Sequence, residues 1–357
     1  MPSSRTPQIA AGTLLLLTLM AVAQDNREFT IPVRVNVVEA PTTVTDKDGS
    51  YITGIKPSEF RLFDNGKLQN IEVHETAAPI SLVVAIQSDA KVESVIPKIQ
   101  RIGNLLETLV AGDQGEVAIV AFDHRIEKLQ DFTSDTNKIQ ESLKKMRPGS
   151  SSSRMIDAVV ESVRMLRSRP KERRRVVLLI SESRDKSSEA HVREALTATQ
   201  MEDVLVYALN MSRLYTEFTA KPEYPRPDPI PSTARHMPAG VPQTPTAAAQ
   251  MTGTQGYGAN FAPMITEIFR AAKAIFVDNP VEVFTKYTGG REIPFVSQRD
   301  LERAVSEIGR EIHNQYIVTY NPDNKEDGGF HQIHVEVQRR NLNIRTRPGY
   351  WMAAVVK

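Results

Sequence analysis

The feature that most constrains the fold is an almost uniformly apolar segment, Ser81 to Ile86, which is followed at once by the polar residues Gln87-Ser88-Asp89-Ala90-Lys91. A strand that is apolar on both faces is typical of the centre of a parallel sheet covered on both sides. The polar loop then leaves the carboxyl end of this strand, where ligands bind in open α/β sheets. Apolar residues at helical spacing between Val95 and Leu109 predict one helix after the loop.

The same alternation of strand and helix continues along the middle of the chain. Further buried strands are predicted at 116–122, 176–180 and 204–209, with amphipathic helices at 139–146 and 156–166. Because parallel strands need crossover connections, this order predicts an α/β fold with a doubly wound, mostly parallel sheet.

Both ends of the chain have a β pattern instead. Asp48-Gly49 and Asn65-Gly66 each separate apolar stretches, which is the strongest short signal for a hairpin. Apolar and polar residues also alternate after position 315. Each group of strands is too small to be stable alone, so we expect the N- and C-terminal strands to pair into one small β-sandwich with the α/β domain inserted between its halves.

The first residues have the pattern of a cleaved secretory signal peptide. Arg5 precedes an apolar run from Ile9 to Val22, and Ala21-Val22-Ala23 supplies a small-residue cleavage site before Gln24. We therefore expect a secreted or periplasmic protein without a stable membrane span after cleavage; an uncleaved anchor is the alternative. The chain contains no cysteine, which excludes disulfides and thiolate metal sites. A formal net charge of +1 argues against nucleic acid as the partner.

Several short stretches together resemble one known family. They are residues 44–49, 60–66, 288–291, 300–304, 315–322 and 344–350. In this order, and with the strand and helix pattern above, the chain resembles the VWFA-related proteins of the acidobacterial type. The resemblance covers nearly the whole mature chain and implies a Rossmann-like von Willebrand factor type A domain.

The resemblance also implies a domain organisation. We expect a signal peptide at 1–23, an N-terminal β segment at 28–77, a type A domain at 79–314 and C-terminal strands at 315–351 that pair with the N-terminal segment. Residues 217–263 are rich in proline and poor in large apolar residues, which predicts a mobile, partly polyproline II insertion in the type A domain.

The family is known for a metal-ion-dependent adhesion site made of oxygen donors, in which Mg²⁺ keeps one position open for a partner's carboxylate. By resemblance, the aligned positions are Gln87 for the first aspartate, Asp89 and Lys91 for two serines, Ser153 for a threonine and Glu182 for the last aspartate. Only Ser153 is a like-for-like replacement. A neutral amide stands where the anchoring carboxylate belongs, and Lys91 brings a positive charge within reach of the cation position.

We interpret this as a degenerate adhesion site without a cofactor, in which Lys91 pairs with Asp89 or Glu182. The predicted ligand-binding surface consists of Gln87, Ser88, Asp89, Lys91, Ser153, Glu182 and Asp185. Two alternatives stay open. Asp89, Ser153 and Glu182 could still hold Mg²⁺, or the loops could merely connect strands to helices.

Other chemical signals are weak. A hydrolase working through Asp89, Glu182 or His124 is the less favoured reading, because no catalytic motif with a positioned nucleophile is present. Asp46 and Asp48 lack the further oxygen ligands of a calcium loop. A basic run between 164 and 175 indicates a solvated helix end, with attraction to an acidic or lipid surface as the alternative. The sequence thus favours a non-enzymatic, extracytoplasmic protein that binds an unidentified protein partner or acts as a scaffold.

Overall fold

The structure is a computed structural model that describes residues 37–75, 78–110, 114–150, 152–185, 187–211, 279–323 and 329–352. The predicted signal peptide and the proline-rich segment 217–263 lie outside the described residues. The same holds for the first residues of the predicted N-terminal β segment at 28–77.

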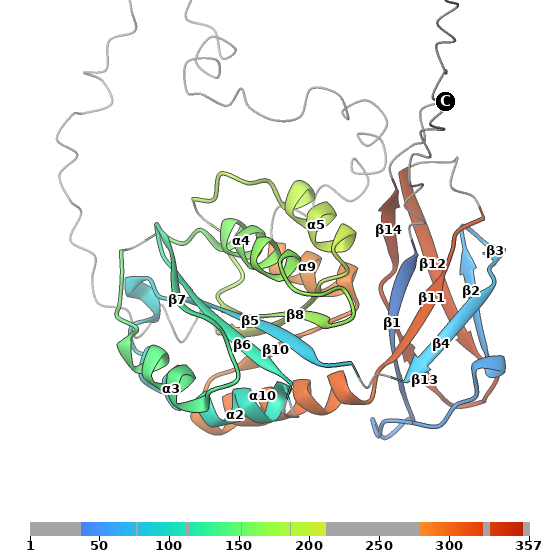
Figure 1. Cartoon of the computed structure of the whole chain (residues 1–357), viewed down its shortest axis with the longest axis horizontal. Helices are drawn as coiled ribbons and strands as arrows, with labels where there is room; N and C mark the ends of the chain where they lie inside the picture. Colours follow the sequence, from blue (N-terminus) through green and yellow to red (C-terminus); the bar gives the residue numbers. More distant parts are fainter. Residues whose placement is uncertain are drawn as a thin grey trace, which may run out of the picture. The chain divides into compact units, whose positions relative to one another are not determined.

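A six-stranded sheet with the order β10-β9-β8-β5-β6-β7 lies between two layers of helices (Figure 1). Its strands are β5 (Ile80–Gln87), β6 (Glu116–Phe122), β7 (Ile126–Thr133), β8 (Arg174–Ser181), β9 (Leu205–Met211) and β10 (Glu292–Phe295). β5 pairs in parallel with both β6 and β8, and only β7 runs antiparallel to its neighbour. The predicted doubly wound, mostly parallel sheet is therefore confirmed.

Helices cover both faces of this sheet, as Figure 1 shows. One face is packed by α1 (Ile96–Ile99), α2 (Gly103–Val110), α3 (Thr136–Lys145) and α10 (Gln298–His313). The other face is packed by α4 (Met155–Arg167), α5 (Val192–Met201) and α9 (Pro280–Thr288). Every residue of β5 is buried, which is the physical reason for its apolar run from Leu82 to Ile86.

Two local features differ from the sequence prediction. The single helix expected between Val95 and Leu109 is broken into α1 and α2, with α2 beginning at Gly103. An added Cβ at Gly103 would lie 2.7 Å from Cγ of Gln140. The edge strand β7 was not predicted, because it is only partly buried and carries charged residues instead of an apolar alternation.

The terminal strands form a sandwich of two four-stranded sheets, with the orders β13-β1-β11-β4 and β14-β12-β2-β3. The N-terminal strands are β1 (Val38–Thr45), β2 (Phe60–Asp64), β3 (Lys67–Leu68) and β4 (Ile71–Glu75), with the short helix η1 (Pro57–Glu59) before β2. The C-terminal strands are β11 (Tyr316–Tyr320), β12 (Gly329–Val337), β13 (Asn343–Arg345) and β14 (Gly349–Met352). Because β1 pairs with β11 and β2 pairs with β12, both sheets combine the two ends of the chain, as predicted.

The core of the sandwich contains a buried polar cluster. Asp64 accepts hydrogen bonds from the hydroxyls of Tyr320 and Tyr350 at 2.9 and 2.8 Å, and its other oxygen lies 2.9 Å from Nδ1 of His331. Burial raises the pKa of both tyrosines, so the hydroxyls keep their protons. Tyr320, Tyr350 and His331 come from three C-terminal strands, so Asp64 of β2 ties the two ends of the chain together.

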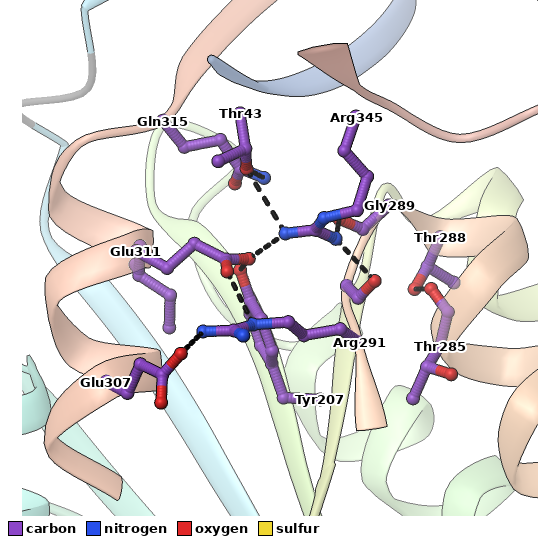
Figure 2. Close-up of polar contacts among 12 residues, drawn as sticks. Thr43, Tyr207, Thr285, Thr288, Gly289, Arg291, Glu307, Glu311, Gln315 and Arg345 are labelled. Atoms are coloured by element: carbon purple, nitrogen blue, oxygen red, sulfur yellow. Dashed lines mark hydrogen bonds and ion pairs between the residues drawn. The ribbon is translucent and has the colours of Figure 1, made fainter. Parts of the chain in front are cut away.

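A second buried cluster connects the sandwich to the six-stranded domain. Glu311 of α10 is 2% exposed and accepts a 2.6 Å hydrogen bond from the Tyr207 hydroxyl of β9. Figure 2 shows the guanidinium groups of Arg291 and Arg345 directed at the same carboxylate, with 2.7 Å between Arg291 Nε and Glu311 Oε2. Arg345 belongs to β13 and also donates to the carbonyls of Gly289 and Gly290, so one side chain joins the two parts.

Candidate functional site

The loop after β5, the loop before α4 and the loop after β8 meet at the carboxyl ends of the central strands. The amide of Ala90 donates to the carbonyl of Ser150 at 3.1 Å, and the amide of Gly149 donates to the carbonyl of Ser88 at 2.6 Å. The amide of Ser187 donates to the carbonyl of Ser153 at 3.2 Å. The loop after β5, the loop before α4 and the loop after β8 therefore form one hydrogen-bonded surface, and the predicted site residues come from these loops.

Gln87 is the last residue of β5, is 1% exposed and uses both ends of its amide. Its Nε2 donates to Asp89 Oδ2 at 3.0 Å, and its Oε1 accepts from the backbone amide of Glu182 at 2.8 Å. A carboxylate at this position could make the second contact but not the first, since an ionised carboxylate has no proton to donate. The amide therefore ties the loop after β5 to the loop after β8.

Asp89 is also 1% exposed and caps the short helix η2 (Ala90–Val92) by accepting from the backbone amide of Lys91 at 3.1 Å. Burial raises the pKa of Asp89, and the nearby charge of Glu182 acts in the same direction. The hydrogen bond from Gln87 opposes this rise. The predicted pairing of the Lys91 ammonium with Asp89 or Glu182 stays a prediction.

The remaining aligned positions are buried as well. Ser88, Ser153 and Glu182 are each less than a tenth exposed. The hydroxyl of Ser153 is buried and has no hydrogen-bond partner among the described residues. Ser88 contributes its backbone, because its amide donates to Phe122 and its carbonyl accepts from Gly149. The site is therefore mostly enclosed, and its polar atoms are committed largely to one another.

Asp185 has a different environment from the other predicted site residues. Its Oδ1 accepts from the amide of Ile156 in the first turn of α4 and from the hydroxyl of Ser188, at 3.2 and 2.7 Å. In return, Asp157 of α4 accepts from the amides of Glu189 and Ala190. These reciprocal contacts hold the loop after β8 against the start of α4, and a direct role of Asp185 in binding stays a prediction.

The sequence interpretation did not give Asp123 a part in the site. This residue follows β6, and its carboxylate accepts from the amides of Ser150 and Arg125 at 2.8 and 2.7 Å. Burial opposes ionisation, but these hydrogen bonds prevail and the pKa of Asp123 is lowered. A Cβ at Gly149 would lie 2.1 Å from Oδ2 of Asp123, so the loop before α4 needs glycine there. The signal that could have found Asp123 is its position directly after a strand parallel to β5.

Asp123, His124 and Ser150 bring together the residue types of a hydrolase triad. However, Oδ2 of Asp123 and the hydroxyl of Ser150 both approach the same ring nitrogen, Nδ1 of His124, at 2.8 and 2.7 Å. A proton relay needs the acid on one nitrogen and the nucleophile on the other. This arrangement is therefore a hydrogen-bonded surface cluster and does not activate the serine.

The donor set fits a divalent cation poorly. A hard cation prefers several carboxylate and hydroxyl oxygens, yet position 87 supplies an amide whose N–H group points at Asp89. Within the described ranges, no group of three or more histidine, cysteine, aspartate or glutamate side chains is placed to hold a metal ion. The features in favour are the carboxylates of Asp89 and Glu182 and the unpartnered hydroxyl of Ser153.

The basic run before β8 is engaged in ion pairs. Arg169 and Arg173 lie 2.6 and 3.2 Å from the Glu116 carboxylate, and Arg175 lies 3.0 Å from that of Glu202. Such contacts favour a structural role for these arginines over a docking site for an acidic surface. Among the residues with described structure, no helix combines the length and apolar composition that a bilayer span requires.

Comparison with protein families agrees with this architecture. Residues 89–184 match the family model of the von Willebrand factor type A domain. Similar solved structures include an aerotolerance-related membrane protein from Bacteroides fragilis (11% identity, 65% of this chain and 98% of that one, TM-score 0.39). BatB from Bacteroides thetaiotaomicron is similar at 13% identity over 65% of this chain and 99% of that one, with a TM-score of 0.37.

A third similar structure is proximal thread matrix protein 1 from the mussel byssus, with a zinc-occupied MIDAS motif (12% identity, 69% of this chain and 49% of that one, TM-score 0.41). These similarities are too low to carry a functional argument. A search of curated proteins found no match. The acidobacterial type of the resemblance stays a prediction. The family match lies within the six-stranded domain described above, and the chain therefore contains a von Willebrand factor type A domain.

Proposed function

We propose that this protein is a non-enzymatic, extracytoplasmic binding or scaffolding protein. In this proposal the loops at the carboxyl ends of the type A sheet contact a protein partner without a divalent cation. The observation that carries the proposal is the Gln87 amide, which donates to Asp89 and accepts from the amide of Glu182. Gln87 thus links two loops through its own hydrogen bonds.

The physical argument concerns what a cation would otherwise contribute. A bound ion cross-links loops through shared oxygen ligands and offers one open position to a carboxylate of the partner. Here the amide of Gln87 and the backbone bonds between Ala90 and Ser150 and between Gly149 and Ser88 already cross-link the loops. A surface that is ordered in advance loses less entropy on binding.

The absence of a catalytic function is proposed from the geometry of the titratable groups. His124 uses a single nitrogen for both Asp123 and Ser150, which leaves no positioned nucleophile. Asp89 is enclosed by protein donors, since both of its carboxylate oxygens accept hydrogen bonds. Neither group is placed to attack or protonate a substrate.

One observation favours a second candidate function, binding of a ligand through a retained divalent cation. The buried hydroxyl of Ser153 has no partner among the described residues, and a buried polar atom without a partner is costly unless something binds it. In this alternative Asp89, Ser153 and Glu182 would hold Mg²⁺.

The location outside the cytoplasm rests on the sequence of residues 1–23. The test is N-terminal sequencing of the protein purified from its source cells. We expect a mature chain that begins at Gln24 and is recovered from the periplasmic or extracellular fraction. Recovery of an intact N-terminus in the cytoplasmic fraction would contradict this part of the proposal.

The binding function is tested by photo-cross-linking in the source cells. A benzophenone amino acid replaces Lys91 at the sheet-end surface, and a matched control replaces Leu68, an exposed residue of β3 in the sandwich. We expect a cross-linked protein from position 91 that is absent at position 68 and unaffected by EDTA. Equal products at both positions would refute the sheet-end surface. Loss of the product in EDTA, with recovery in Mg²⁺, would establish the cation-dependent alternative.

A further inference from the structure

The charged residues at the carboxyl ends of the type A sheet differ in exposure according to their sign. The carboxylates in the loops after β5, β6 and β8 are buried, with Asp89 1%, Asp123 6% and Glu182 8% exposed. Basic side chains on neighbouring segments are exposed instead. Five of them form what we call the basic rim: Arg101, Arg125, Lys144, Lys145 and Arg147. This region is therefore positively charged, although the whole chain has a formal net charge of only +1.

Four members of the basic rim come from the ends of α1 and α3. β7 runs antiparallel to β6, so α3, which follows β7, leads the chain back to the carboxyl ends of the parallel strands. Nε2 of Gln100, the neighbour of Arg101, donates to the carbonyls of Lys144 and Met146 at 3.4 and 3.3 Å. Nη1 of Arg147 donates to the same two carbonyls at 3.0 and 3.3 Å. These four residues therefore lie on adjoining backbone at the last turn of α3.

Arg125 connects this group to the candidate site. Its amide donates to the carboxylate of Asp123 at 2.7 Å, and the same carboxylate accepts from the amide of Ser150 at 2.8 Å. Ser150 belongs to the loop before α4, which also reaches the loop after β5, because the amide of Gly149 donates to the carbonyl of Ser88 at 2.6 Å. The basic rim is therefore continuous with the sheet-end surface and lies on its β6 side.

The charges of the basic rim are not neutralised within the chain. None of its five side chains forms an ion pair with a carboxylate of the described residues. Glu127 and Glu141 are the exposed carboxylates on the same segments, so the basic groups are in excess. By contrast, arginines of the run before β8 pair with glutamates. The dipole of α3 favours basic residues in its last turn, but Arg101 and Arg125 lie outside that helix.

The chemistry of the basic rim fits carboxylates better than a bilayer or a nucleic acid. Guanidinium groups bind carboxylates through paired hydrogen bonds. Stable attachment of basic residues to a bilayer usually adds an apolar anchor. The exposed large apolar residues of the described chain lie on other segments, at Val37, Leu68, Met201 and Val296. Single-stranded nucleic acids stack their bases on aromatic rings, and residues 99–101, 123–127 and 141–150 contain no phenylalanine, tyrosine or tryptophan.

We propose that the basic rim binds an acidic segment of the protein partner. This inference rests on the proposed function, because it names the chemistry of the partner that the sheet-end surface contacts. The segment lies across the last turn of α3 and the adjoining loops, and its carboxylates pair with the guanidinium and ammonium groups of the basic rim. Complementary charge speeds the encounter and selects the partner. Binding therefore weakens as the salt concentration rises and requires no divalent cation.

The first test uses the whole protein and a short fluorescein-labelled peptide of alternating aspartate and serine, at about 0.15 M salt. The rim variant is Arg101→Glu with Lys145→Glu, and neither side chain has a hydrogen bond or ion pair within the described chain. The matched control, Lys171→Glu with Arg340→Glu, has the same net charge and changes exposed residues before β8 and between β12 and β13. We expect saturable binding that the rim variant weakens roughly tenfold and the control leaves within about twofold.

The second test uses the natural partner. The photo-cross-linking experiment at position 91 is repeated in the rim variant and in the control variant. We expect the cross-linked product to decrease in the rim variant and to persist in the control. An undiminished product in the rim variant would show that the sheet-end surface binds its partner without the basic rim, which overturns this inference and leaves the proposed function standing. Absence of the product in the native protein would refute the proposed function, and this inference with it.

Three outcomes with the peptide also overturn the inference. The first is the absence of saturable binding to the native protein, and the second is equal weakening by the rim variant and the control. The third is equal binding of a peptide in which asparagine replaces each aspartate, since this would show that charge does not determine binding. If phosphatidylglycerol vesicles bind through the basic rim and the acidic peptide does not, the basic rim is a membrane contact instead.

Discussion

Glu311→Gln is the substitution that most directly tests how the sandwich is attached to the type A domain. Gln and Glu have the same shape, so the change removes the negative charge and little else. In the native protein this carboxylate is 2% exposed and is shared by Arg291, Arg345 and the Tyr207 hydroxyl (Figure 2). The variant leaves two guanidinium groups facing a neutral amide.

The expected loss in free energy of unfolding follows from how deeply the Glu311 carboxylate and its two arginine partners are buried. Breaking a fully buried ion pair by removing one partner costs about 3–5 kcal/mol. The side chains of Arg291 and Arg345 are 29% and 35% exposed, so water compensates part of the lost charge. We therefore expect Glu311→Gln to lower the free energy of unfolding by about 2–4 kcal/mol. Glu307→Gln, one turn earlier on α10, breaks a 2.7 Å pair with Arg291 that is about a third exposed, and should cost about 0–1 kcal/mol.

The chain provides a separate spectroscopic probe for each part. Trp351 in β14 is the only tryptophan, so its fluorescence reports on the sandwich. The described α-helices all pack on the sheet of the type A domain, so circular dichroism at 222 nm reports on that domain. In urea titrations we expect the two signals to share one midpoint in the native protein and in Glu307→Gln. In Glu311→Gln the fluorescence midpoint should fall below that of the helical signal.

Two results would refute this reasoning. If Glu311→Gln and Glu307→Gln lose the same free energy, the buried carboxylate has no special role. If Glu311→Gln loses several kcal/mol while both probes still change together, the cluster stabilises the chain without governing the attachment of the sandwich.

Three further predictions concern the sheet-end loops. Gln87→Glu sets a second carboxylate against Asp89, so Mg²⁺ should raise the melting temperature of this variant and leave that of the native protein unchanged. Burial raises the pKa of Asp89, so the folded state holds this proton more tightly than the unfolded state, and stability falls as pH rises from about 3.9 through the raised pKa. Asp89→Asn should remove this part of the pH dependence in urea titrations between about pH 4 and 7. Gly149→Ala forces a Cβ to within 2.1 Å of Asp123 and should cost about 1–3 kcal/mol in thermal unfolding, whereas Ser150→Ala should change stability by less than about 0.5 kcal/mol.

Much of the fold could be predicted from the sequence because buried positions are mostly occupied by apolar residues, and this pattern can be read along the chain. β5 is apolar from Leu82 to Ile86 since both of its faces are covered. The pairing of the two chain ends followed from size, since neither group of strands could be stable alone. The break between α1 and α2 could not be predicted, because the apolar residues keep helical spacing across it.

The candidate site could be predicted as a location but not as a set of contacts. Parallel strands end at one edge of the sheet, so residues after β5 and β8 had to meet there. Which partner each side chain takes depends on loop paths that the local sequence does not determine. Asp185 therefore accepts a hydrogen bond from the start of α4. Asp123, which no sequence motif indicated, accepts one from the loop before α4.

The chemistry of Gln87 explains how the loops after β5 and β8 are held together. An aspartate would carry a charge that calls for a cation, whereas an amide presents a donor and an acceptor at the same time. The donor meets the carboxylate of Asp89 and the acceptor meets the amide of Glu182, so residue 87 is satisfied on both sides. Asp89 in turn needs that donor, because a buried carboxylate without hydrogen bonds would be strongly destabilising. The amide and the carboxylate thus depend on each other, and together they hold the loops after β5 and β8 in place.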